Sequence, residues 1–261
     1  MCTIIRTAKL VGTLTGFDEL YGMCVDAKGD VYVANFGAGN ALEYTHGGTT
    51  VINTFDSGGT PIGCSVDSKG DVAVTSFDPG EVTVFAGGDP SKGATYAGSC
   101  TYLWSMGYDN RGNLVGIGET SSGGRCYAGL ASGSKSMEAL SFSGTIDFPG
   151  GTTWDGKYIA LGDQEADGSD NTGMIEATLS GSTLKSHGEA ILTCARGFSD
   201  VVNPFVVGKK NTPINDQQGK VVIGSGCDGG IGFWHYPKGG DQFKNYSGDA
   251  DPYGAAVSLG T

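Results

Sequence analysis

The sequence predicts an all-β fold, a β-propeller formed by a single domain over residues 1–261. Glycine fills 47 of the 261 positions, far above the roughly 7% of average proteins, and it weakens helix interiors. Short runs rich in Val, Ile, Tyr and Phe alternate with turn residues, which is typical of many short strands. A segment of similar sequence also returns about every 40 residues, the length of one propeller blade.

The repeat is clearest in two segments. Residues 20–35 read LYGMCVDAKGDVYVAN and residues 61–76 read PIGCSVDSKGDVAVTS, so Asp26 and Asp67 stand 41 residues apart. The pattern returns at Asp109 and, shortened, at Asp155. Repeats of this length that hold four short strands predict four-stranded antiparallel blades around a central channel.

Each unit divides into four expected strands. The first ends in Asp, whose side chain can cap the following turn, and a glycine such as Gly29 or Gly70 supplies the positive φ that a tight turn needs. In the first two units the second strands are VYVAN (31–35) and VAVTS (72–76), the third ALEYTH (41–46) and EVTVFA (81–86), and the fourth TVINTF (50–55) and ATYAG (94–98).

Six first strands can be counted, near Cys24, Cys64, Gly107, Thr153, Ser199 and Ala255. The N-terminal stretch 4–16 matches a fourth strand, because it directly precedes the first unit. We therefore expect six blades of four antiparallel strands, closed by pairing of the N- and C-terminal strands in one blade, which removes exposed sheet edges. Five and seven blades are the alternatives, because an insertion at 209–218 interrupts the repeat pattern in the fifth unit.

Several segments resemble the NHL-repeat and SMP-30-like group of propellers, above all exported bacterial NHL-type proteins of undefined activity. They are GYDNRGNL (107–114), PGGTTWDGKYIALGDQ (149–164) and WHYPKGGD (234–241), together with the repeated Asp-x-Lys-Gly-Asp. The resemblance covers nearly the whole chain and implies the propeller fold. The group includes binding scaffolds, lactonases and lyases, so the fold alone does not assign a chemistry.

Charge and hydropathy exclude two classes of partner. The net charge of −12 disfavours nucleic acid, because binding to phosphate backbones depends on cationic side chains. No apolar run approaches the ~18 residues of a transmembrane helix. No signal-peptide pattern precedes the first expected turn either.

The seven cysteines indicate an oxidising compartment. Cys100 and Cys194 lie in links that lead into first strands, and Cys126 and Cys227 follow the second strands of the same units. Both pairs are expected at the same end of a propeller, which predicts the disulfides Cys100–Cys126 and Cys194–Cys227. Cys24 and Cys64 lie inside first strands and are expected to be buried free thiols. An extracellular or periplasmic location follows from the predicted disulfides.

The end of the ring that carries these cysteines also collects aromatic and charged residues at the starts of the first strands. They are the candidate ligand-binding residues Tyr21, Trp104, Phe198, Tyr253, Asp18 and Arg196. Aromatic side chains at a channel mouth can stack on sugars or other flat molecules, or they pack at blade junctions.

The resemblance to SMP-30-like hydrolases implies a divalent cation held by acidic and amide side chains that converge over the channel. Asn35, Glu119 and Asp163 leave the second strands at equivalent positions and are the candidate ligands. The alternative is that these side chains cap turns and face solvent.

A second candidate metal site is local. In the loop GDQEADGSDNTG (162–173), Asp163, Glu165, Asp167 and Asp170 surround Gly168 and approximate a calcium-binding loop. Position twelve of that pattern is Met174 instead of a bidentate Glu. Calcium or another divalent cation is therefore one expectation and a solvated acidic turn the other.

Two functions follow from these observations, and whether the protein is an enzyme stays open. The first is an exported binding or interaction module for a small molecule, glycan or protein. The second is a divalent-metal-dependent hydrolase of the SMP-30 or lactonase type. No catalytic residue is assigned, because His46, His187 and His235 fall in outer strands. An assembly role through the glycine-rich faces is a third possibility, and the sequence leaves the oligomeric state undetermined.

Overall fold

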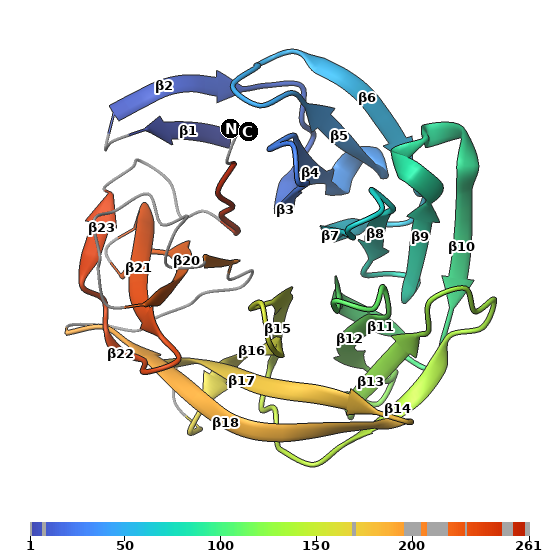
Figure 1. Ribbon diagram of the computed structural model, residues 1–261, viewed down its shortest axis with the longest axis vertical. Helices are drawn as coiled ribbons and strands as arrows, with labels where there is room; N and C mark the ends of the chain where they lie inside the picture. Colours follow the sequence, from blue (N-terminus) through green and yellow to red (C-terminus); the bar gives the residue numbers. More distant parts are fainter. Residues whose placement is uncertain are drawn as a thin grey trace.

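A computed structural model describes residues 2–6, 9–168, 171–195, 205–207, 219–227, 229–246 and 253–258. These residues form antiparallel sheets arranged as a ring around a central axis, as Figure 1 shows. Within the described residues the only helices are short 3-10 turns, at Phe36–Ala38, Ala86–Gly88 and Pro90–Lys92. No helix in this part of the chain is long and apolar enough to cross a membrane. The predicted all-β propeller fold is confirmed.

The first two sheets follow the repeat read from the sequence. Each is a four-stranded meander in which the first strand lies nearest the axis and the fourth lies outermost (Figure 1). Their strands are β3 (Leu20–Val25), β4 (Val31–Asn35), β5 (Asn40–Tyr44) and β6 (Val51–Asp56), then β7 (Pro61–Val66), β8 (Val72–Ser76), β9 (Glu81–Phe85) and β10 (Gly93–Ala97).

The next two meanders are joined at their outer edges. Their strands are β11 (Tyr102–Tyr108), β12 (Leu114–Glu119), β13 (Arg125–Leu130) and β14 (Glu138–Phe142), then β15 (Pro149–Trp154), β16 (Ile159–Ala166), β17 (Asn171–Ser180) and β18 (Thr183–Thr193). Strand β14 pairs in parallel with β18, which in turn pairs with β22 (Gly240–Asp241). The long β18 therefore covers edges that would otherwise be free for pairing with another chain.

The fifth meander contains β19 (Phe205–Val207), β20 (Lys220–Ser225), β21 (Ile231–Tyr236) and β23 (Lys244–Tyr246). Its first strand includes Phe205–Val207, and the first strand that the sequence places near Ser199 lies outside the described residues. The described part of this strand is an apolar Phe-Val-Val segment that pairs with β20. Strands β1 (Cys2–Arg6) and β2 (Lys9–Leu14) form a separate two-stranded sheet.

The turns between first and second strands have the predicted chemistry. The Asp26 carboxylate accepts hydrogen bonds from the backbone N–H groups of Lys28 at 2.9 Å and Asp30 at 2.8 Å. Gly29 has φ of 87°, a conformation that costs most side chains about 1–2 kcal/mol. The repeated Asp-x-Lys-Gly-Asp is therefore a turn motif that ends the first strands β3 and β7 at the same end of the ring.

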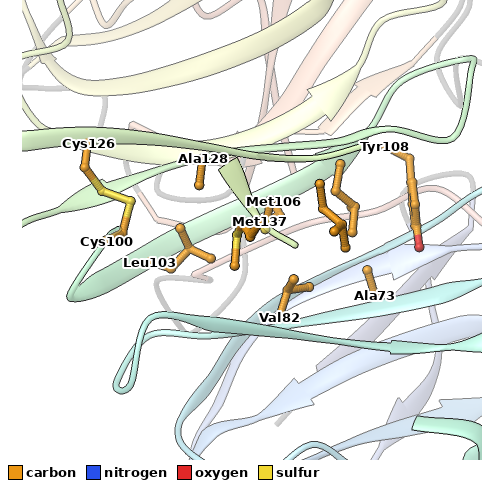
Figure 2. Packing of buried hydrophobic residues seen from close by; sticks show 11 residues of the cluster. Ala73, Val82, Cys100, Leu103, Met106, Tyr108, Cys126, Ala128 and Met137 are labelled. Carbon is orange, nitrogen blue, oxygen red and sulfur yellow. A yellow bond between two sulfur atoms is a disulfide. The ribbon is translucent and has the colours of Figure 1, made fainter. Parts of the chain in front are cut away.

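Neighbouring sheets pack face to face through apolar side chains. Figure 2 shows the cluster between the β7–β10 and β11–β14 sheets, with the Cys100–Cys126 disulfide near one end and Tyr108 near the other. Val82 and Leu103 are fully buried within it. Burial of such side chains contributes about 1.5–3 kcal/mol each, and this packing positions the first strands around the axis.

Three disulfides link parts of the ring that are distant in the sequence. Cys100–Cys126 and Cys194–Cys227, each with a Cα–Cα distance of 5.7 Å, confirm the two predicted pairs. Cys24 and Cys64 form a third disulfide with a Cα–Cα distance of 5.6 Å, so the expectation of free thiols was wrong. First strands of adjacent sheets approach closely near the axis, and these two side chains point toward each other.

Candidate functional site

The loop face is the end of the ring formed by the links into β3, β7, β11 and β15 and by the loops after β4, β8, β12 and β16. Side chains near the ends of second strands hold the links in place there. Asn35 Oδ1 accepts the Asp18 N–H at 2.6 Å, and Ser76 Oγ accepts the Thr60 N–H at 3.0 Å. The same geometric role is therefore filled by different residue types in successive repeats.

Asp163 fills this role in the fourth sheet. It is 3% exposed, and its carboxylate accepts the backbone N–H groups of Asp147 at 2.8 Å, Phe148 at 2.9 Å and Glu165 at 3.1 Å. The carboxylate thus fixes both the link into β15 and the start of the acidic loop. Three N–H donors compensate the burial of its charge.

Glu119 has a different environment from Asn35 and Asp163. The Glu119 backbone carbonyl holds the link by accepting the Thr101 N–H at 2.9 Å, which leaves the carboxylate for other partners. That carboxylate accepts the Trp104 indole N–H at 3.0 Å and forms an ion pair with Arg125. Arg125 also donates to the Asp147 carbonyl. Glu119 therefore orients an aromatic ring and a cation at the loop face.

The aromatic cluster of the loop face consists of Phe77, Tyr102, Trp104 and Phe148. Phe77 stacks on Tyr102 with ring centroids 5.1 Å apart, and Trp104 stands edge-on to Phe77 at 5.2 Å and to Phe148 at 5.0 Å. The Arg125 guanidinium lies 5.6 Å from the Phe148 ring. All four rings are half-buried, so they contact one another and still present surface to solvent.

Of this cluster, the sequence singled out only Trp104. Phe77 immediately follows the second strand, as Phe36 does one repeat earlier, and this recurrence was the available signal. Tyr102 begins β11 and Phe148 lies in the link before β15, and the sequence pattern does not fix where either ring points.

Tyr21 and Trp104 share a backbone feature. The β3–β4 register shifts between Leu20 and Met23, and the β11–β12 register shifts between Leu103 and Ser105. Such β-bulges redirect a side chain away from the regular alternation of a strand and are frequent beside functional sites. The bulges therefore explain how both rings come to lie at the loop face.

A second aromatic group surrounds Tyr21. Its ring lies 4.9 Å from Phe36 and 4.7 Å from Tyr253, which is 48% exposed. Burial raises the pKa of Tyr21, and the neighbouring Tyr253 and Glu19 raise it further. The predicted pair Tyr21 and Tyr253 is thus in direct contact.

The remaining predicted residues fall into two sets. Asp18, Glu165 and Asp167 are exposed, and the Gly168 N–H donates to the Glu165 carbonyl at 3.2 Å in a tight turn. Phe198, Arg196 and Asp170 lie outside the described residues. Among the residues that the structure describes, no three His, Cys, Asp or Glu side chains are grouped to hold a metal ion.

Charge on the described part of the loop face is mainly negative. Arg125 is a cation already paired with Glu119. The exposed carboxylates there are Asp18, Glu19, Asp78, Asp147, Glu165 and Asp167. Glu19 and Asp167 adopt positive φ values of 60° and 62°, the only non-glycine residues to do so in the described chain. The field of this face favours neutral or cationic ligands.

The axis of the ring contains a cavity of about 170 Å³ lined by β3, β7, β11 and β15. Its wall includes Cys24, Cys64 and small polar side chains such as Ser105, which donates to the Gly150 carbonyl at 2.9 Å. Trp154 lines the cavity at the end opposite to the loop face. The histidines lie elsewhere: His187 is in the outer strand β18, where its Nε2 is 2.8 Å from Thr178 Oγ1.

A group of ionisable side chains lies between the fourth and fifth sheets. The Asp155 side chain is fully buried, with Oδ2 3.1 Å from Lys220 Nζ. Burial, followed by the nearby Asp155 carboxylate, raises the pKa of Glu176, and burial raises that of Tyr236. Because Asp155 and Tyr236 are shielded from solvent, this group serves the junction between sheets.

Comparisons with known proteins identify the fold. No protein family model and no curated protein sequence matches the chain. A structure of a nidogen/laminin complex contains a chain that is 16% identical over 92% of this chain and 85% of its own, with a TM-score of 0.65. A gluconolactonase from Xanthomonas campestris is 13% identical, with 90% of this chain and 78% of the other covered and a TM-score of 0.62.

A streptogramin B lyase structure is also similar, at 13% identity and a TM-score of 0.54, with 84% of this chain and 69% of the other covered. Identities this low establish the fold without an activity. The chain is a β-propeller similar in fold to SMP-30-like and NHL-type propellers, as the sequence motifs indicated.

Proposed function

We propose that the protein is a binding or interaction module whose loop face takes a small molecule, glycan or protein. The observation that carries this proposal is the aromatic cluster around Trp104, whose indole N–H is held by Glu119 at 3.0 Å. A rigid, half-exposed group of rings with a few placed polar groups is typical of recognition sites. Fixing the rings before binding lowers the entropy cost of association.

Charge narrows the ligand class. The exposed carboxylates of the loop face disfavour polyanions such as nucleic acid or acidic glycans. Neutral sugars, with apolar faces and hydroxyl groups, fit both the rings and the Glu119–Arg125 pair. A protein ligand with a basic surface fits the same charge pattern, and the nidogen neighbour occurs in a complex with laminin.

A neutral glycan array tests the proposal. We expect the labelled protein to bind a restricted set of neutral glycans and the Trp104→Ala variant to lose about tenfold or more in affinity for them. The indole contributes both contact area and the orientation of its neighbours, and removing such a residue commonly costs 2 kcal/mol or more. Affinities of the array hits are then measured by calorimetry.

The matched control is Trp154→Phe, which alters a half-buried indole at the opposite end of the ring. This variant should bind as the unchanged protein does. Identical array patterns for the unchanged protein and Trp104→Ala would contradict the assignment of the loop face.

The alternative function is a divalent-metal-dependent hydrolase of the lactonase type, supported by the gluconolactonase neighbour. In this proposal Asn35, Glu119 and Asp163 hold the ion, with the loop carboxylates Glu165, Asp167 and Asp170 as a second, calcium-type site. Each of the first three side chains would have to exchange a present hydrogen-bond partner for metal. Lactone hydrolysis that calcium, zinc or manganese restores after chelation would support this alternative.

Export and a six-bladed ring complete the proposal. Three disulfides are typical of oxidising compartments. Leu14 of β2 packs with Val33 and Leu42 of the first meander, as a neighbouring blade would. Ser258 donates to the Gly29 carbonyl, which brings the C-terminal segment beside the same meander (Figure 1). A sixth blade built from both ends of the chain accounts for these contacts.

A further inference from the structure

The end of the ring opposite to the loop face carries a groove that the proposed function does not use. It has a volume of about 160 Å³ and lies between the third and fourth sheets, where their first-to-second-strand turns meet β17. The turn residues that line it are Asp109, Asn110, Arg111 and Lys157.

The groove combines apolar and cationic side chains. Its apolar lining residues, Trp154, Ile159, Ala177 and Leu179, are buried or half-buried, and Arg111 and Lys157 line it as well. Both cations are exposed, and the ion pairs found among the described residues involve neither of them. The Lys157 ammonium lies 4.4 Å from the centroid of the Tyr158 ring, which positions it through a cation–π contact.

The acidic residue in the groove, Asp109, forms no ion pair with these cations. Asp109 Oδ1 accepts the backbone N–H groups of Arg111 at 2.8 Å and Asn113 at 2.9 Å, and Oδ2 accepts the Asn113 side-chain amide at 2.8 Å. Both oxygens of the Asp109 carboxylate therefore accept hydrogen bonds from N–H groups of the turn to which Asp109 itself belongs. The formal charge of the groove lining is positive on a chain whose net charge is −12.

The turns of the third and fourth sheets each place a cation beside apolar side chains of the groove. Lys28 and Lys69 occupy the equivalent turn positions in the first two sheets, two residues after Asp26 and Asp67. Neither lines this groove or the axial cavity. The repeat thus supplies a cation at each of these four turns, and the two from the third and fourth sheets line the groove together with Trp154.

We propose that this groove binds a small aromatic carboxylate. An apolar cavity of about 150 Å³ accommodates benzene, so a space of about 160 Å³ matches a molecule of the size of benzoate. The ring would lie on Trp154 and Leu179, and the carboxylate would accept paired hydrogen bonds from the Arg111 guanidinium and a further one from Lys157.

Titration with benzoate, benzamide and acetate separates the contributions of ring and charge. Binding is followed by calorimetry and by the indole N–H resonance of Trp154, assigned with Trp154→Phe. We expect benzoate to bind about tenfold or more tightly than benzamide, which lacks the charge, and than acetate, which lacks the ring. Arg111→Gln should weaken benzoate binding about tenfold, and Lys157→Gln by several-fold.

Lys28→Gln is the matched control, because it removes an equivalent turn cation away from the groove. It should leave benzoate affinity within about twofold. The proposal is overturned if benzoate and benzamide bind equally, if acetate binds as tightly as benzoate, if Lys28→Gln weakens binding as much as Arg111→Gln, or if 20 mM benzoate causes no shift of the Trp154 resonance.

Discussion

Replacing Cys24 and Cys64 together with alanine is expected to lower the free energy of unfolding by about 2–4 kcal/mol. This disulfide links the first strands of two adjacent sheets and joins residues separated by 40 positions. Its removal lets the unfolded chain explore more conformations and leaves the inner ends of two sheets held by packing alone. The melting temperature under non-reducing conditions should fall by roughly 5–15 °C, measured by calorimetry.

Alkylation gives an independent check on this bond. Without reductant, peptides that contain Cys24 and Cys64 should remain unlabelled in the unfolded protein, and with reductant both should be labelled. The Cys100→Ala/Cys126→Ala variant is the matched comparison, since its bond spans 26 positions and should give a similar or slightly smaller loss. Labelling of both thiols without reductant, with an unchanged melting temperature in the variant, would exclude the bond.

The spacing of Cys24 and Cys64 relative to the repeat could have predicted this disulfide. The repeat places Asp26 and Asp67 41 residues apart, whereas Cys24 and Cys64 are 40 apart. A shift of one residue in a strand moves a side chain to the opposite face of the sheet. Two cysteines at the same position of the repeat would lie on the same face of their sheets. Because Cys24 and Cys64 are offset by one residue, their side chains face each other across adjacent sheets.

The repeat predicted the strand order of the first four sheets because turn chemistry and apolar runs recur together there. In the fifth sheet it placed a first strand near Ser199, which lies outside the described residues, and the described part of the first strand there is Phe205–Val207. Residues 209–218 lengthen the segment between that strand and β20. The sequence pattern alone does not decide which of the apolar segments before residue 209 pairs with β20.

Candidate site residues were only partly predictable for a related reason. Trp104 and Tyr21 were recognised from their position at the starts of first strands, but a bulge decides where each ring points. Phe77 and Phe148 come from different repeats and meet Trp104 only when the sheets are assembled. The sequence placed Asn35 and Asp163 at equivalent positions, but only the folded chain shows that both side chains accept hydrogen bonds from the links into first strands.

Replacing Asp163 with alanine is expected to lower the free energy of unfolding by about 3 kcal/mol. Three backbone N–H groups lose their acceptor, and a buried donor without a partner costs about 1–3 kcal/mol. The link that carries Phe148 would loosen, so the aromatic cluster should lose order as well. Calorimetry measures the stability, and the Trp104 indole resonance, shifted by the Phe148 ring, reports on the cluster.

Asp163→Asn and a chelator separate this structural role from metal binding. The amide keeps one acceptor oxygen, so Asp163→Asn should lose about 1 kcal/mol, and EDTA should leave the melting temperature of the unchanged protein where it was. Ser76→Ala, which removes a single acceptor for the Thr60 N–H, should cost about as much as Asp163→Asn. If EDTA destabilises the unchanged protein and Asp163→Asn abolishes that effect, the carboxylate is a metal ligand, and the hydrolase becomes the better account of the loop face.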